Sequence, residues 1–154
     1  MSSKRNPEAK DDWQTPECVL ERVRRIDRIG LDPASCVGNP TGARVHLTPK
    51  QDGLSCTWKN SGLVWVNPPY KPPWYRKILS EANGGAEIVA LLMAKPGAGY
   101  FQDLAGTASA ICFWRGRLTF EGAPATAAFD SALLYFGPRP ATFRLAFRGA
   151  GWLV

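Results

Sequence analysis

Two consecutive prolines follow a short apolar run near the middle of the chain, and this arrangement constrains the fold more than any other feature. The run Leu63-Val64-Trp65-Val66 is apolar and mostly β-branched or aromatic, and it follows a glycine, so it predicts a buried strand. Asn67-Pro68-Pro69-Tyr70 comes next. Because two prolines can neither extend a sheet nor enter a helix interior, the chain must be rigid just beyond the strand. In open α/β sheets, ligands bind at that edge.

The pattern of apolar residues along the rest of the chain predicts an α/β sandwich. Helical and extended segments alternate through most of the sequence, which favours a largely parallel central sheet. Strands late in the chain leave no room for helices between them, so that part of the sheet is expected to be antiparallel. We expect helices at 16–29, 72–82 and 99–104, and strands at 31–34, 44–48, 63–66, 88–93, 110–114, 131–136 and 143–147, with an edge piece at 118–120. Thr15 is expected to cap the first helix, with Pro16 at its first position and Gly30 at its end.

Composition and length indicate one globular domain. The chain has 154 residues, of which 45% are hydrophobic and 21% charged. We expect a flexible tail at residues 1–12 and a single domain at residues 13–154. No apolar run approaches the roughly 20 residues of a membrane span. The polar N-terminus lacks the apolar core of a signal peptide, so a cytoplasmic location is expected.

The cysteines and the single histidine argue against a metal site. The four cysteines are scattered without paired spacing, which predicts free thiols and neither zinc nor a disulfide framework. His46 is the only histidine and lies between apolar residues, as in a strand. Chemistry that needs a histidine base is therefore disfavoured, and no metal is expected.

The tetrapeptide carries the groups needed to hold a planar amino group. The Asn67 side chain and the backbone carbonyl of Pro68 offer two acceptors for its hydrogens. Tyr70 offers an aromatic face on which a ring could stack, and Pro69 keeps the turn rigid. We therefore expect Asn67, Pro68, Pro69 and Tyr70 to form a clamp for such a group.

Three other segments are candidates for binding a nucleotide-like cofactor. Asp32-Pro33-Ala34 lies at the end of a predicted strand, where a carboxylate could bind a cationic or hydroxyl-bearing ligand. The alternative is an Asx-turn, in which Asp32 accepts a hydrogen bond from its own backbone. Thr15 and Pro16 begin a helix whose free N–H groups suit a carboxylate, or they simply cap it. Asp52 could accept from an amino group or be a solvated turn residue. Trp13 could cover the cofactor or anchor the tail.

Basic residues after two of the predicted strands suggest a polyanionic partner. The net charge is +6, and affinity for nucleic acid depends largely on phosphate neutralisation. Lys71, Arg115 and Arg117 are the candidates for phosphate contacts, although Arg115-Gly116-Arg117 is equally typical of an exposed basic turn. Trp74 could form an aromatic wall beside them or belong to the core.

Taken together, five ordered segments resemble the phage-type DNA adenine methyltransferase (Dam) family. They are Trp13-Gln14-Thr15-Pro16, Leu31-Asp32-Pro33-Ala34, Asp52-Gly53-Leu54 with Trp58, Asn67-Pro68-Pro69-Tyr70, and Gly116-Arg117-Leu118-Thr119-Phe120. The resemblance implies a Rossmann-like methyltransferase fold and methyl transfer from S-adenosylmethionine to the N6 amine of adenine in DNA. It also implies a cofactor-carboxylate site at Thr15, a cofactor pocket at Asp32 and Asp52, and an adenine clamp at the tetrapeptide. A monomer or weak homodimer in the cytoplasm of a bacterial host, encoded by a phage or prophage, is expected.

The sequence departs from the family pattern in one segment and leaves alternatives open. Residues 94–101 stand where a threonine-containing segment ending in Trp-Phe is expected. The same tetrapeptide also serves methylation of adenine in RNA or of a glutamine amide in protein. A third alternative is an inactive DNA-binding relic with a decayed cofactor pocket.

Overall fold

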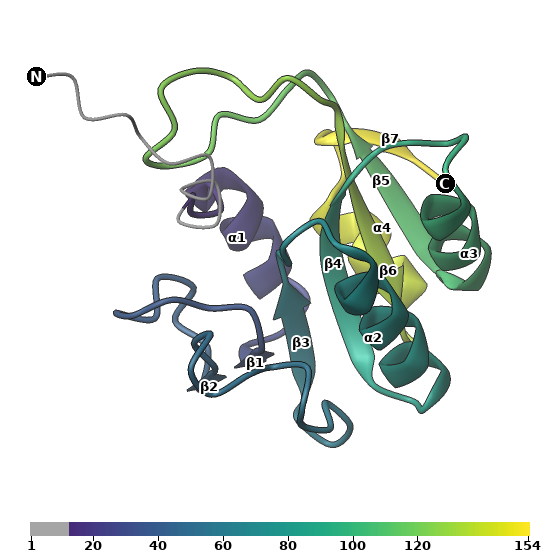
Figure 1. Ribbon diagram of the computed structural model, residues 1–154. Coiled ribbons are helices and arrows are strands. Elements are labelled where there is room, and N and C mark those ends of the chain that lie inside the picture. The colour runs from purple at the N-terminus through teal and green to yellow at the C-terminus, as the bar shows by residue number, and fades with distance from the viewer. Residues whose placement is uncertain (1–12) are drawn as a thin grey trace, which may run out of the picture.

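A computed structural model describes residues 13–154, and in this range seven strands form one sheet (Figure 1). The strand order is β2-β1-β3-β4-β6-β5-β7. The strands are β1 (Ile29–Asp32), β2 (Val45–His46), β3 (Leu63–Val66), β4 (Glu87–Met93), β5 (Ala110–Trp114), β6 (Ser131–Phe136) and β7 (Gly151–Leu153). The first four are parallel, whereas β6 is antiparallel to β4 and β5, and β7 is antiparallel to β5. The predicted α/β fold, with a parallel first part and an antiparallel last part, is confirmed. The expected tail at 1–12 lies outside the described residues.

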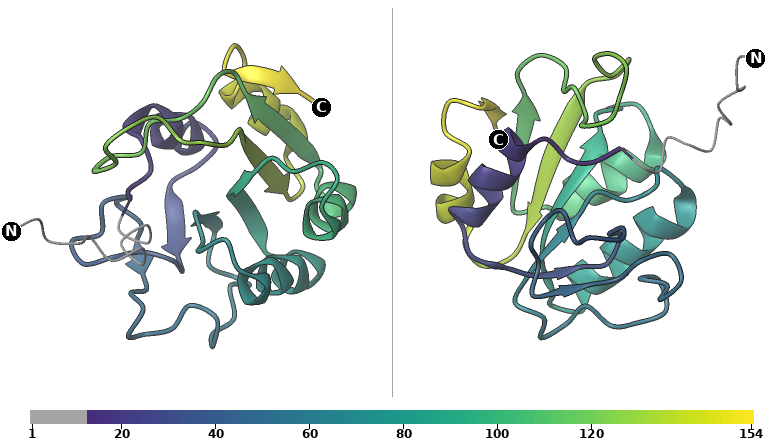
Figure 2. Two further views of the ribbon diagram at one scale, coloured as in Figure 1. Left: turned by 45° about the horizontal axis from the view of Figure 1, so that its top comes forward. Right: turned by 90° about the vertical axis from the view of Figure 1, so that its left-hand side faces the viewer.

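Helices cover both faces of the sheet (Figures 1 and 2). The helices are α1 (Glu17–Arg24), α2 (Pro72–Asn83), α3 (Gly99–Thr107) and α4 (Pro140–Ala146). Side chains of α2 and α3 belong to one buried cluster, and those of α1 and α4 belong to the other. Among residues 13–154, no helix has the length and apolar character needed to cross a membrane.

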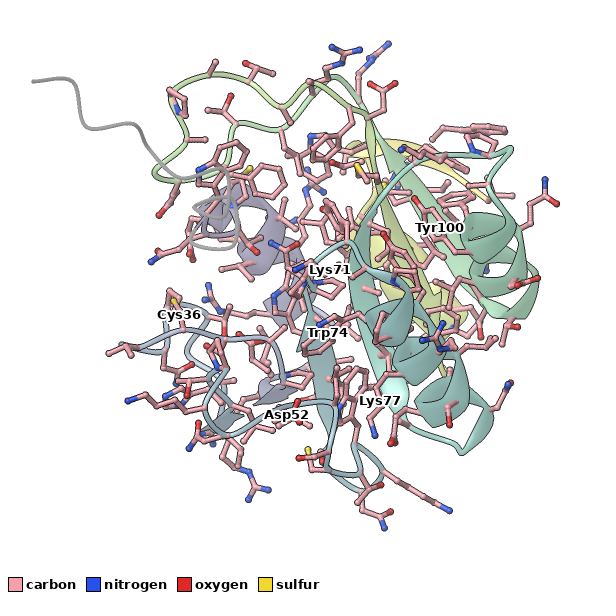
Figure 3. The ribbon with its side chains drawn as sticks, viewed as in Figure 1. Cys36, Asp52, Lys71, Trp74, Lys77 and Tyr100 are labelled. Carbon is pink, nitrogen blue, oxygen red and sulfur yellow. The ribbon has the colours of Figure 1, made fainter. Side chains whose placement is uncertain are left out.

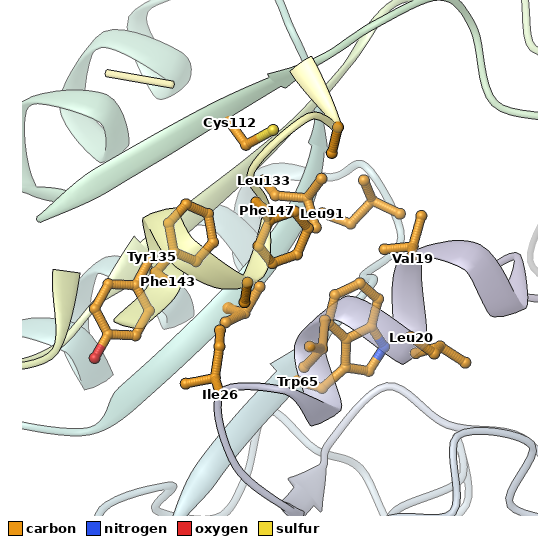
Figure 4. Close-up of a cluster of buried hydrophobic side chains, with 14 of the residues drawn as sticks. Val19, Leu20, Ile26, Trp65, Leu91, Cys112, Leu133, Tyr135, Phe143 and Phe147 are labelled. Carbon is orange, nitrogen blue, oxygen red and sulfur yellow. The ribbon is translucent and has the colours of Figure 1, made fainter. Parts of the chain in front are cut away.

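Strand β4 shows why its sequence is an unbroken apolar run. Successive side chains of a strand point to opposite faces. Ile88, Ala90 and Leu92 accordingly enter the cluster beneath α2 and α3, while Val89 and Leu91 enter the cluster beneath α1 and α4. Figure 4 shows the second of these clusters, in which Leu91 lies among side chains of β3, β6, α1 and α4. A strand buried on both faces cannot alternate apolar with polar residues.

Gly30 was expected to end the first helix, and this expectation is wrong. Helix α1 ends at Arg24, and Gly30 lies inside β1. A Cβ atom at Gly30 would lie 1.9 Å from the backbone oxygen of Ser61. Glycine is therefore required here, because two backbone segments approach each other closely. Strand β1 begins at Ile29, two residues before the predicted start.

The predicted strand at 143–147 is also wrong, because these residues belong to α4 and the position after it. Pro140 opens the helix, which suits the first turn. Phe143 and Phe147 are both fully buried, and their rings stack with centroids 4.6 Å apart. Residues four apart share a helical face, so this spacing serves a helix. Residues 118–120 form no strand either; the nearby pairing is a single antiparallel bridge between Gln14 and Glu121.

The topology brings several loops to one edge of the sheet. Because β1 to β4 are parallel, the loops that follow them leave at the same edge. Strands β4 and β5 are each antiparallel to β6, so the loop after β5 leaves there as well. This edge holds the candidate site.

Candidate functional site

A cavity of about 750 Å³ opens at the carboxyl ends of the parallel strands. It is lined by Trp13, Pro33, Ala34, Ser35, Leu47, Thr48, Pro49, Asp52, Gly53, Leu54, Asn67, Pro68, Pro69, Tyr70, Lys71, Trp74, Met93, Phe120 and Phe129. The whole tetrapeptide lines this cavity, as do four of the seven predicted cofactor-binding residues. Lys71 and Trp74 also line it, and both come from the chain segment that opens α2 (Figure 3).

Asn67 lies immediately after β3 with its side-chain oxygen unused. Its Nδ2 donates a hydrogen bond of 3.1 Å to Thr15 Oγ1. Within residues 13–154, no donor bonds Asn67 Oδ1 or the carbonyl oxygen of the buried Pro68. The turn is closed by a 2.8 Å bond from the Lys71 N–H to the Pro69 carbonyl. Two acceptors therefore remain available in a rigid segment beside the cavity.

Tyr70 lines the cavity, and its hydroxyl is buried. The Tyr70 oxygen is buried and has no hydrogen-bond partner among the described residues. Burial raises the pKa of the Tyr70 hydroxyl well above its usual range, so the phenol stays neutral at physiological pH. The ring contacts Phe129 edge-on, with centroids 5.7 Å apart. Tyr70 can therefore act as an aromatic surface but not as a proton-transfer group.

An aromatic wall formed by Trp13, Phe120 and Phe129 borders the cavity beside Tyr70. The Trp13 and Phe120 rings stack at 6.5 Å, and Phe120 and Phe129 are 6.3 Å apart. Phe120 ends a segment that the sequence singled out, but Phe129 was not predicted. Its neighbours in sequence form no recognisable motif, and only the tertiary fold places its ring against Tyr70.

Asp32 does not line the cavity, although Pro33 and Ala34 do. Its side chain is buried, with one carboxylate oxygen accepting from Thr41 Oγ1 at 2.8 Å and the other from the Ala34 N–H at 3.2 Å. Desolvation raises the pKa of the Asp32 carboxyl despite these bonds. The bond from the Ala34 N–H forms an Asx-turn, which was one of the two alternatives for Asp32 in the sequence. Asp32 thus shapes the loop that carries Pro33 and Ala34 to the cavity.

Asp52 lines the cavity because the next residue is held against the loop after β1. A Cβ atom at Gly53 would lie 1.9 Å from the Pro33 carbonyl oxygen, so this contact requires glycine. The buried Trp58 indole donates a 2.9 Å bond to the Gly53 carbonyl. Asp52 itself is exposed, and its Oδ1 accepts from the Leu54 N–H at 3.2 Å. Gly53, the neighbour of Asp52 in the sequence, is thereby fixed against Pro33, and Asp52 and Pro33 both line the cavity.

The start of α1 differs from the expected capped helix. The helix begins at Glu17, with Pro16 as the cap residue and no side-chain capping bond. Thr15 and Pro16 are buried and do not line the cavity. The Thr15 hydroxyl bonds Asn67 instead of the helix backbone, so the prediction that it caps α1 is wrong. Glu17, in the first turn, is paired with Arg24.

The predicted nucleic-acid contacts fall into two groups. Lys71 is exposed at the cavity, and the half-buried Trp74 packs against Trp58 with ring centroids 6.5 Å apart. Arg115 and Arg117 are exposed in the loop after β5 and do not line the cavity. Arg117 Nε lies 3.5 Å from a carboxylate oxygen of Asp130. Over residues 13–154, no group of three or more metal-ligating side chains is found.

Comparison with known proteins identifies a family for this arrangement. Residues 2–133 match the family described as DNA N-6-adenine-methyltransferase (Dam). No curated protein matches the chain. The family match covers most of the sequence, including every loop that lines the cavity, and the α/β sheet is consistent with a methyltransferase fold. The chain therefore belongs to the DNA N-6-adenine-methyltransferase (Dam) family.

Proposed function

We propose that the protein transfers a methyl group from S-adenosylmethionine to the N6 amine of adenine in DNA, with Asn67-Pro68-Pro69-Tyr70 as the clamp. The observation that carries this proposal is the pair of unused acceptors, Asn67 Oδ1 and the Pro68 carbonyl, beside an aromatic ring in a cavity. The family membership supports DNA adenine as the substrate class. Residues 13–154 form the methyltransferase domain in this proposal.

The cavity suits S-adenosylmethionine in size and in chemistry. Its volume of about 750 Å³ falls in the range of small-molecule sites. Asp52 supplies an acceptor at its rim, and Trp13 supplies a ring. Pro33 and Ala34 form an apolar wall next to Asp52. These four residues would hold the cofactor, while Asp32 shapes the loop from behind. When bound, the cofactor supplies an electrophilic methyl group.

The clamp residues activate the adenine amine by accepting its hydrogens. An aromatic amine is a weak nucleophile because its lone pair is delocalised into the ring. Asn67 Oδ1 and the Pro68 carbonyl accept one N–H each, which favours a pyramidal nitrogen and frees the lone pair. Fixing this geometry lowers the barrier by several kcal/mol, on the order expected for orientation effects. The proton leaves after the nitrogen becomes cationic, so the neutral Tyr70 need not act as a base.

The target adenine must leave the base stack to reach the clamp. A base inside a duplex cannot enter an enclosed pocket, so the enzyme flips it out or acts on an unpaired base. Tyr70 would stack on it, and such stacking contributes roughly 1–3 kcal/mol. Lys71 and the exposed Arg115 and Arg117 would contact phosphates at the same edge of the sheet. Trp74 would extend the aromatic surface beside Lys71.

The test is Asn67→Ala, with nucleoside mass spectrometry of methylated substrate. We expect loss of N6-methyladenine in DNA, while calorimetry shows nearly unchanged binding of S-adenosylmethionine. Asn83→Ala, at the exposed end of α2, is the matched control and should retain full activity. Labelled methyl transfer to DNA, RNA and protein pools identifies the substrate. Full activity of Asn67→Ala would refute the clamp, and labelling of RNA or protein alone would refute the DNA substrate.

A further inference from the structure

We propose that the Thr15 hydroxyl is a positioning group that holds the Asn67 amide with its oxygen toward the substrate amine. This inference rests on the proposed function and extends it to a residue outside the clamp. It assigns Thr15 a different role from binding the carboxylate of the cofactor. Thr15 does not line the cavity, and its side-chain bond is to Asn67.

The bond is made in one of the two orientations of the amide, the one in which Nδ2 faces the hydroxyl. The adenine amine, which offers only N–H groups to the amide, favours the same orientation. An asparagine amide carries an acceptor on one side and donors on the other, and its last torsion is broad and roughly two-fold. Asn67 Nδ2 lies 3.1 Å from Thr15 Oγ1, which leaves Oδ1 as the group free to accept. A flipped amide would turn its N–H groups toward the N–H groups of adenine, and two donors cannot bond each other. The correct orientation is therefore a condition for catalysis.

The hydroxyl is mounted on a rigid backbone, so it cannot follow a rotating amide. On one side of Thr15, Gln14 exchanges two backbone bonds with Glu121, of 3.1 and 3.0 Å. On the other side, the Pro16 ring fixes the backbone, and its carbonyl accepts the first bonds of α1. Thr15 itself is only 8% exposed. The fixed hydroxyl thus acts on Asn67 from outside the substrate cavity.

The experiment compares Thr15→Val, which removes the hydroxyl at nearly constant shape, with Thr15→Ser, which keeps it. Small errors in orientation cost up to about 100-fold in rate. We expect kcat for DNA methylation to fall roughly 10- to 100-fold in Thr15→Val, with the cofactor Kd within about twofold of wild type. Thr15→Ser should recover most of the rate. Thr107→Val, at the exposed end of α3, is the control for the substitution itself.

The proposal is overturned if Thr15→Val weakens cofactor binding and leaves kcat unchanged, or if it changes neither. A cofactor Kd that rises tenfold or more while kcat at saturating cofactor is unchanged would assign Thr15 to cofactor binding. An unchanged kcat and Kd would show that the bond does not matter. Should Thr15→Val fail to fold by circular dichroism, Thr15→Ala replaces it with the same expected outcomes.

A nuclear magnetic resonance readout tests the bond independently of activity. The Asn67 side-chain amide signals are assigned by their loss in Asn67→Ala. In wild type the two amide protons should be well separated, because one is hydrogen-bonded, and in Thr15→Val they should move toward solvent-exposed values. Unchanged signals in Thr15→Val overturn the proposal. If wild type shows the bonded signature but methylates no adenine, the proposed function fails while the contact stands.

Discussion

Replacing Tyr70 by phenylalanine should stabilise the protein. The Tyr70 oxygen is buried without a partner among the described residues, and leaving a buried polar group unpaired costs about 1–3 kcal/mol. Phenylalanine removes this group and keeps the ring against Phe129. After allowing for lost contacts of the oxygen, we expect a gain of about 1 kcal/mol. For a chain of this length, that corresponds to a melting temperature roughly 2–4 °C higher.

Tyr135→Phe provides the matched control. Tyr135 is also buried, but its hydroxyl donates to Glu87 Oε1 at 2.5 Å and accepts from the Arg139 N–H at 2.9 Å. Its loss should cost about 1–3 kcal/mol, because both partners are left behind. Urea unfolding at constant m-value measures both variants. If Tyr70→Phe loses as much stability as Tyr135→Phe, the Tyr70 hydroxyl has a partner and the reasoning is wrong. DNA methylation should persist in Tyr70→Phe, because the ring provides the stacking surface.

Two further predictions concern charge. Desolvation raises the folded-state pKa of Asp32 above 3.8, so wild-type stability should fall as pH rises from 3.8 through that folded pKa. The unfolding free energy of Asp32→Asn minus that of wild type should therefore increase over this window and then level off; a difference that decreases with pH would contradict the assignment. Reversing charge at Arg115 and Arg117 should weaken DNA binding and reduce the salt slope by about two. The same reversal at the exposed Arg25 and Arg28, before β1, should leave the slope unchanged, and equal effects in both pairs would place the Arg115 loop outside the interface.

The parts of the fold that the sequence predicted correctly depend on local signals. Strand β3 ends at Val66 because prolines follow it. The unbroken apolar run of β4 predicted a strand, and both faces of this strand are buried. The failures occur where a tertiary contact decides the structure. Gly30 looks like a helix end, but its role is to let β1 approach Ser61. Aromatic residues at 143 and 147 suit a strand by composition, yet packing makes them one face of a helix.

In the candidate site, too, local sequence signals were predicted correctly and tertiary contacts were missed. The tetrapeptide and Asp52 were predicted because proline and Asp-Gly signals fix their local backbone, and both line the cavity. Phe129 was not predicted, because its position depends on where a long loop returns to the sheet. The contact of Thr15 with Asn67 was equally hidden, since it joins residues 52 positions apart. The roles of these residues in binding and catalysis remain predictions.

The order of strands in the sheet has a consequence for biosynthesis. Strand β6 lies between β4 and β5, although it is made after both. While the nascent chain leaves the ribosome, β5 has no neighbour to pair with until residues 131–136 have emerged. Pairings between distant segments form slowly and leave strand edges open meanwhile. The loop with Phe120 and Phe129 spans the same interval, so the cavity that these rings line is completed only after β6 has been made.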